Sequence, residues 1–224
     1  MTSVFSSVTL LPLVIILTGA PLRAAPTLPV CPARAAARHD AIGVRVVQVR
    51  IFNQSDIPDD RVSRVIDVAN RIWHPYGISF EPGMETGRAV AIVVGDRANP
   101  AAYRQSTPVL GTTLFSDGHA QPYIHLSPAV AETMAGEISQ VDAGLPFHSR
   151  LPPERDRILQ QILGTALAHE MAHLLLDTSH HSGTGLLRPG LRLRDAMSGN
   201  PVELSLTPDQ LGRLCDAGAN PQSR

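Results

Sequence analysis

Four of the nine histidines of this 224-residue chain lie in one stretch, ALAHEMAHLLLDTSHHSGTGLL, at residues 166–187. His169 and His173 are four positions apart, so on a helix their imidazoles project from one face, one turn apart. A single histidine on such a face is commonly a hydrogen-bonded core residue. Two neutral imidazoles side by side need partners, and a metal ion such as zinc serves both. The spacing therefore predicts a metal-binding pair.

Glu170 follows the first histidine directly and lies about 100° further round the helix. From there its carboxylate borders the metal without binding it. It is placed to take a proton from a zinc-bound water and to pass it to a leaving amine. We therefore expect Glu170 to be a catalytic general base.

A catalytic zinc takes three protein ligands and keeps one position open. Asp177 is excluded as the third ligand while the helix continues, since the rise from residue 169 to 177 is about 12 Å. Its carboxylate could instead orient a metal-bound imidazole, or Asp177 could only cap the helix break. Asp, Thr and Ser at 177–179 are poor helix formers and predict a break that brings His180 or His181 back to the pair. From spacing alone, both remain candidates.

The elements that must position these residues follow from periodicity. The metal-binding helix is predicted over 153–176, opened by proline, with an inward stripe at Leu159, Ile162, Ala166, His169, His173 and Leu176. Other helices are predicted over 59–77 and 206–215, and strands over 43–53, 78–83, 88–96, 111–115 and 122–128. Turn-rich chain is predicted over 99–118, with the short strand at 111–115 inside it, a loop over 136–153, and irregular chain from 182 to the last helix. This order indicates an α+β fold with a mixed sheet and a helix on one face.

Composition limits the classes of protein. With 43% hydrophobic residues and a formal charge of −1, the chain can form a single domain, expected over 41–220, and gives no reason to expect nucleic acid as a partner. The apolar run at residues 10–20 has the length of a signal peptide and is too short to span a bilayer. We expect a signal peptide over 1–24, a linker over 25–40, no stable membrane insertion after the leader is removed, and a secreted or periplasmic protein.

Export favours a disulfide between the two cysteines, Cys31 and Cys215. The alternative is two unpaired core cysteines. Among the other histidines, His125 is expected to be an exposed strand residue. No partner spacing is found for the remaining four, which are His39, His74, His119 and His148.

The histidine-rich stretch resembles the metzincin clan of zinc metallopeptidases, whose motif H-E-x-x-H-x-x-G-x-x-H precedes a tight methionine turn. The match covers His169, Glu170 and His173. Leu176 stands in place of the glycine and Ser179 in place of the third histidine. The resemblance implies a metzincin-like mixed sheet packed on an active-site helix. It also implies a substrate extended along an edge strand, for which 122–128 is the candidate; an ordinary surface strand is the alternative.

The stretch is also similar to a group of exported bacterial proteins with the pattern H-E-x-x-H-L-L-L, a short link, and H-S-x-x-G-I-M. This specific similarity covers about residues 160–190, and a LTPDQL helix near the end is shared. It implies His181 as the third ligand. Leu186 and Leu187 replace the Ile-Met pair, and Met197 is a possible substitute for the methionine.

These observations predict an exported zinc-dependent metallopeptidase that hydrolyses peptide bonds through a zinc-bound water. Its site residues would be Glu170 as general base and three zinc ligands, His169, His173 and His181. Its cofactor would be Zn²⁺ and its partner a peptide or protein substrate. Two alternatives remain: a zinc-stabilised, non-catalytic binding domain, and a zinc hydrolase acting on a non-peptide amide. If both His180 and His181 bound the metal, the site would be closed and the binding domain would be favoured.

Overall fold

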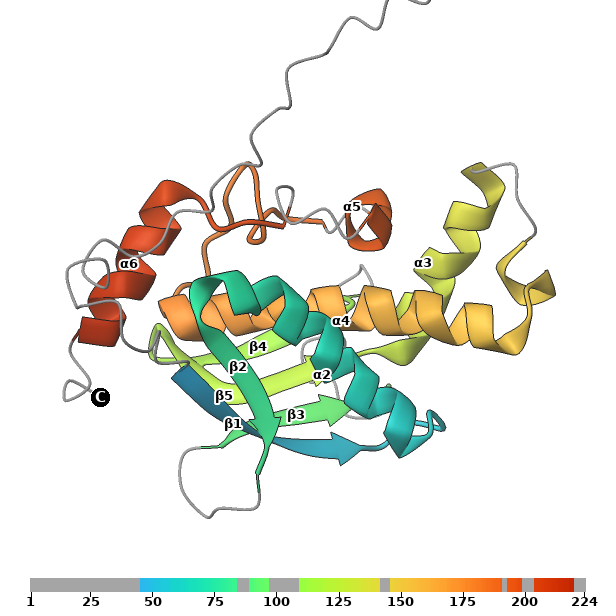
Figure 1. Ribbon diagram of the computed structural model, residues 1–224, viewed down its shortest axis with the longest axis horizontal. Coiled ribbons are helices and arrows are strands. Elements are labelled where there is room, and N and C mark those ends of the chain that lie inside the picture. The colour runs from blue at the N-terminus through green and yellow to red at the C-terminus, as the bar shows by residue number, and fades with distance from the viewer. Residues whose placement is uncertain are drawn as a thin grey trace, which may run out of the picture.

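The fold combines a five-stranded mixed sheet with helices packed on it, as the sequence predicted (Figure 1). The structure, a computed structural model, describes residues 45–83, 89–96, 109–141, 146–190, 193–198 and 204–219. The strands are β1 (Arg45–Asn53), β2 (Ile78–Pro82), β3 (Val90–Val94), β4 (Gly111–Ser116) and β5 (His119–Leu126). The helices are α2 (Asp59–Trp73), α3 (Pro128–Val141), α4 (Pro152–Leu176), α5 (Leu193–Ser198) and α6 (Pro208–Ala219), with 3-10 turns η1 (His74–Tyr76) and η2 (Phe147–Ser149).

The strands lie in the order β2-β1-β3-β5-β4. Neighbouring strands are parallel except β4, which runs antiparallel to β5. A two-residue turn joins β4 to β5, and both its residues, Asp117 and Gly118, have positive φ angles of 53° and 82°. Such a turn matches the right-handed twist of a hairpin. In the strand order given above, β4 is an outer strand of the sheet and β5 is an interior one.

The expectation that residues 122–128 form the edge strand is wrong. β5 pairs with β3 on one side and with β4 on the other, and Ile124, His125 and Leu126 are all buried. His125, expected to be exposed, is only 1% exposed. A strand that is covered on both faces of the sheet does not alternate between apolar and polar residues. The residue pattern of such a short segment therefore does not show whether one strand or two pair with it.

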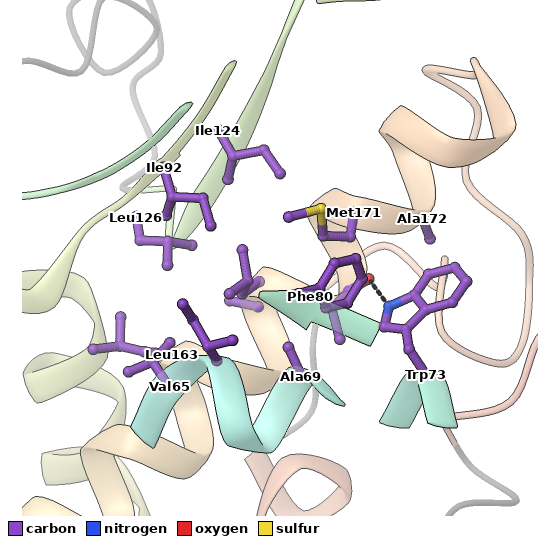
Figure 2. Close-up of a cluster of buried hydrophobic side chains, with 14 of the residues drawn as sticks. Val65, Ala69, Trp73, Phe80, Ile92, Ile124, Leu126, Leu163, Met171 and Ala172 are labelled. Atoms are coloured by element: carbon purple, nitrogen blue, oxygen red, sulfur yellow. Dashed lines mark hydrogen bonds between the residues drawn. The ribbon is translucent and has the colours of Figure 1, made fainter. Parts of the chain in front are cut away.

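The long helix α4 lies along one face of the sheet, with α2 beside it (Figure 1). Every residue from Ile162 to Ala168 is buried, so the middle of this helix is enclosed on all sides rather than along the single predicted stripe. Close packing on α2 depends on Gly164, where a Cβ atom would lie 2.3 Å from the Cβ of Val68. Trp73 donates a hydrogen bond of 3.1 Å from its indole to the carbonyl of Ala168 (Figure 2).

Two helices lie where the sequence predicted loop or irregular chain. α3 covers Pro128–Val141, although 136–153 was expected to be a loop, and α5 is a short helix within a segment expected to be irregular. The start of α3 is nevertheless marked in the sequence. The Ser127 hydroxyl accepts a hydrogen bond of 3.3 Å from the backbone N–H of Val130, and a proline follows it, as is typical of a helix start.

The predicted signal peptide at 1–24, the linker at 25–40, and Cys31 and His39 lie outside the described residues. Cys215, which lies among the described residues, is disulfide-bonded; its pairing with Cys31 stays a prediction, because Cys31 lies outside those residues. Within the same ranges, no helix has the length and apolar character needed to cross a membrane. The C-terminal helix α6 packs at the end of α4, where Arg213 donates a hydrogen bond of 3.1 Å to the carbonyl of Leu176.

Candidate metal centre

Three histidines meet at the C-terminal part of α4. Their ligating nitrogen atoms all lie within 4.8 Å of one another: those of His169, His173 and His181. The rings of His169 and His173 are 4.8 Å apart between centroids, and the ring of His181 lies 4.8 Å from His173 and 5.3 Å from His169. His180, the other candidate, is exposed and lies outside this cluster. The structure therefore brings His181 to the helical pair.

The chain reverses at Asp177, whose φ and ψ angles of 47° and 55° are left-handed. Past this residue the backbone N–H of Thr178 donates to the carbonyl of His173 at 3.1 Å. The Asp177 carboxylate accepts hydrogen bonds of 2.8 Å from Nδ1 of His119 and from the backbone N–H of Ala120. Asp177 thus fastens the β4–β5 hairpin to the helix end. Whether it also orients a zinc-bound imidazole stays a prediction, and the Nδ1 atoms of the two histidines of α4 contact backbone carbonyls.

Backbone carbonyls orient the two helical histidines. Nδ1 of His169 lies 2.6 Å from the carbonyl oxygen of Leu186, and Nδ1 of His173 lies 2.6 Å from that of Thr178. Because a carbonyl oxygen only accepts, each Nδ1 must carry the proton. In the neutral rings, both Nε2 atoms are then left with a lone pair.

The two Nε2 atoms are 3.1 Å apart. Burial, reinforced by charge repulsion from His173, lowers the pKa of His169 to about 4, and burial also lowers the pKa of His173. Both rings are therefore neutral near pH 7, and their lone pairs repel unless a cation lies between them. Tetrahedral zinc with bonds of about 2.0–2.1 Å separates its nitrogen ligands by about 3.3 Å, so the spacing of this pair fits a zinc-sized ion.

Glu170 is buried, with 7% exposure, on the side of α4 that faces β4. Its Oε2 accepts a hydrogen bond of 2.8 Å from the hydroxyl of Thr113. Burial raises the pKa of Glu170 to about 7, while the hydrogen bonds from Thr113 act in the opposite direction. A carboxylate with a pKa in this range can both accept and return a proton near neutral pH.

The turn after His181 places the carbonyl that holds His169. Gly185 has a φ of 76°, and a Cβ there would lie 2.3 Å from the carbonyl oxygen of Ser205. The next residue, Leu186, donates from its backbone N–H to that same oxygen at 2.8 Å. Leu186 and Leu187, in place of the Ile-Met pair, are each 1% exposed and belong to the core. A turn without methionine therefore still packs its apolar residues inside.

A cleft of about 630 Å³ opens beside the three histidines and Glu170. β4 forms one wall and α3 another. Leu110 and Ala166, with Val130 and Met134 of α3, give the cleft apolar walls. His169, His173 and His181 lie on its lining together with Glu170.

The sequence did not predict two features of this site. One is the hydrogen bond from Thr113 to Glu170, and the other is the pair of backbone carbonyls, of Leu186 and Thr178, that orient His169 and His173. Periodicity carries no signal for them, because they join distant parts of the chain or use backbone atoms.

Arg188, which follows the turn, makes an ion pair with Asp195 of α5. It is therefore engaged in holding that helix.

No family model matches the chain, and no curated protein matches its sequence. Function is therefore inferred from the donor set and its surroundings.

Proposed function

We propose that this chain is an exported zinc-dependent metallopeptidase with a metzincin-like fold. The observation that carries the proposal is the meeting of three ligating imidazoles with one buried carboxylate, Glu170, that is not part of the metal-binding set. A purely structural zinc site commonly has four protein ligands and needs no such carboxylate. The three-histidine set leaves a position open for water and substrate.

His169, His173 and His181 would hold the zinc. When bound, zinc acts as a Lewis acid that acidifies water and polarises the carbonyl of a substrate. The carbonyls of Leu186 and Thr178 keep the proton on Nδ1 of the two helical ligands, so that each offers Nε2. Such outer hydrogen bonds fix ring orientation and raise ligand basicity.

Glu170 would act as general base and then as general acid. Its carboxylate takes a proton from the attacking water, and the same proton then goes to the amine nitrogen as the C–N bond breaks. Burial supports this double role, since a carboxyl group with a pKa of about 7 transfers protons readily in both directions at neutral pH.

A peptide is the substrate that the surroundings favour. β4 is an outer strand, paired within the described residues only to β5, and its residues line the cleft with the histidines. An extended peptide can add to such an edge through main-chain hydrogen bonds. β4 thus takes the substrate-binding role that the sequence had suggested for residues 122–128.

Two other functions are separable from this one. A zinc-stabilised binding domain would use the histidines but not Glu170, and a hydrolase for a non-peptide amide would use both without needing the edge of β4.

Export is part of the proposal because of the predicted signal peptide, and the mature N-terminus of protein secreted by an expressing bacterium would check it.

The decisive experiment compares the parent with Glu170→Gln, which keeps the shape of the side chain and removes the base. The parent should hold about one zinc per chain and cleave members of a mixed peptide library. The Gln variant should keep the zinc and lose about 10²- to 10⁴-fold in rate. If the variant cleaves as well as the parent, the catalytic role is wrong. Zinc binding without cleavage by the parent supports the binding domain, and cleavage of simple acyl amides alone supports the third function.

A further inference from the structure

Two residues of the outer strand β4, Gly111 and Thr113, lie against Glu170. They are two positions apart on the strand. Thr113 is only 7% exposed, and its register partner on β5 is Ile124, a core residue. Its hydroxyl lies 2.8 Å from Oε2 of Glu170 and 3.0 Å from the backbone carbonyl oxygen of the same residue. Side chains two apart on a strand point to the same face, so both positions face α4.

Thr113 restrains one carboxylate oxygen. A threonine hydroxyl has a single proton, and both acceptors within reach belong to Glu170. When it donates to Oε2, that oxygen is held against β4, and a hydrogen bond to a charged acceptor is among the stronger ones in proteins. The other oxygen, Oε1, does not take part in this hydrogen bond.

Gly111 provides the space for the rest of the carboxylate. A Cβ atom at this position would lie 2.9 Å from Cγ and 3.0 Å from Oε1 of Glu170. Contacts at these distances are shorter than ordinary van der Waals contact, so any side chain at residue 111 would push the carboxylate from its place. The reason for glycine here is the close approach of Glu170, because no positive φ is found at this residue.

We propose that Gly111 and Thr113 are positioning residues for Glu170: the hydroxyl holds Oε2, and the missing side chain leaves Oε1 room to meet the water. The inference rests on the proposed peptidase function and deepens it. Neither residue binds the metal. Their effect should therefore be on kcat, since they place the base, and not on zinc content.

The test uses the mature chain with zinc and the best substrate from the library. Thr113→Val keeps the size and β-branching and removes the hydroxyl; it should lower kcat by about 10- to 100-fold, with KM and zinc content little changed. Thr113→Ser should restore most of the loss. Gly111→Ala should lower kcat by about tenfold or more through displacement of the carboxylate.

Thr165→Val is the matched control, because Thr165 is also fully buried, on α4, and its hydroxyl donates to the carbonyl of Gln161. It should leave kcat unchanged. An unchanged kcat in Thr113→Val, a serine variant as slow as the valine variant, or an effect on KM alone would overturn the positioning role.

Crystal structures of the zinc-loaded parent and Thr113→Val separate this inference from the proposed function. If no variant or parent cleaves peptides, the peptidase assignment fails, yet the positioning of Glu170 is still measured. Displaced or multiple carboxylate positions in the valine variant support the inference. A carboxylate in the same place in both structures overturns it.

Discussion

Asp177 binds His119 through a contact of 2.8 Å between the carboxylate Oδ2 and the imidazole Nδ1, and so ties the end of α4 to the tip of the β4–β5 hairpin. The other oxygen, Oδ1, accepts the backbone N–H of Ala120, also at 2.8 Å. Asp177 adopts a left-handed conformation with a φ of 47°. The residue that reverses the chain toward His181 is therefore also the residue that anchors it.

Asp177→Gly should separate these two roles, because glycine adopts a positive φ without strain. The variant keeps the bend and loses the contacts of the carboxylate, so its free energy of unfolding should fall by about 1–3 kcal/mol, with weaker zinc binding as the bend loosens. Asp177→Asn, which keeps one accepting oxygen, should lose less. Urea unfolding and zinc titration measure both effects. A glycine variant as stable as the parent would show that the anchor contributes nothing.

Removal of His181 should release the metal. His181→Ala leaves two ligands on α4, and its zinc affinity should fall by more than about 100-fold, since loss of outer-sphere contacts alone costs about 10–100-fold. His180→Ala changes the exposed neighbour and should bind zinc as the parent does. Competition with a chromophoric chelator gives both constants. Equal losses in the two variants would mean that His180 also binds, which would favour the closed, non-catalytic site.

Gly185→Ala should damage the turn that presents the Leu186 carbonyl to His169. Alanine at a φ of 76° is strained, and its Cβ would lie 2.3 Å from the Ser205 oxygen. We expect a loss of about 2 kcal/mol or more in unfolding free energy. Gly183→Ala is the control, since a Cβ there meets no atom of the described residues within 4 Å, and it should change stability by less than about 0.5 kcal/mol. Thermal unfolding of both variants tests the pair, and equal stabilities would refute the prediction.

Much of the local arrangement could be predicted because it lies within one helix. The places of His169, Glu170 and His173 follow from 3.6 residues per turn, and the helix break after Leu176 follows from residue type. The order of strands could not be predicted, because pairing of β5 on both sides depends on segments far apart in the chain. The contact between Thr113 and Glu170 spans 57 residues, and neither residue type signals it.

The remaining unpredicted contacts use the main chain. Any residue has a carbonyl, so no residue type at 178 or 186 marks the oxygens that orient the two helical histidines. Asp177 shows the opposite case: its residue type correctly marked the helix end, while its partner on the hairpin was hidden because the fold, and not the spacing, places His119 beside it.

Stability should fall in mild acid because of His125. Among the described residues, its two buried ring nitrogens have no hydrogen-bond partner of normal geometry. Burial lowers the pKa of His125 below 6.5, against smaller opposite effects from the Gly95 backbone and Asp96. The unfolded chain therefore takes up a proton as the pH falls through about 6.5 while the folded chain does not. Stability is full above that pH and is lost below it, by at most about 1.4 kcal/mol per pH unit.

His125→Leu should remove this part of the pH dependence. Urea unfolding of the zinc-free parent and variant at pH 7.5, 6.5 and 5.5 gives the free energy of unfolding of each protein against pH. The difference between the two curves isolates the contribution of His125 from that of the other histidines. The leucine variant should show a shallower decrease below pH 6.5. Parallel curves would show that the buried ring titrates as it does in the unfolded chain.

The hydrogen bond from Trp73 to the carbonyl of Ala168 gives the chain a built-in optical reporter. This indole is the only one in the sequence and is fully buried, and the carbonyl that it contacts belongs to the residue just before His169. Its fluorescence originates from a single position, so changes in intensity or wavelength on adding zinc can be assigned to the helix that carries the ligands. Metal loading and unfolding can thus be followed without attaching a dye.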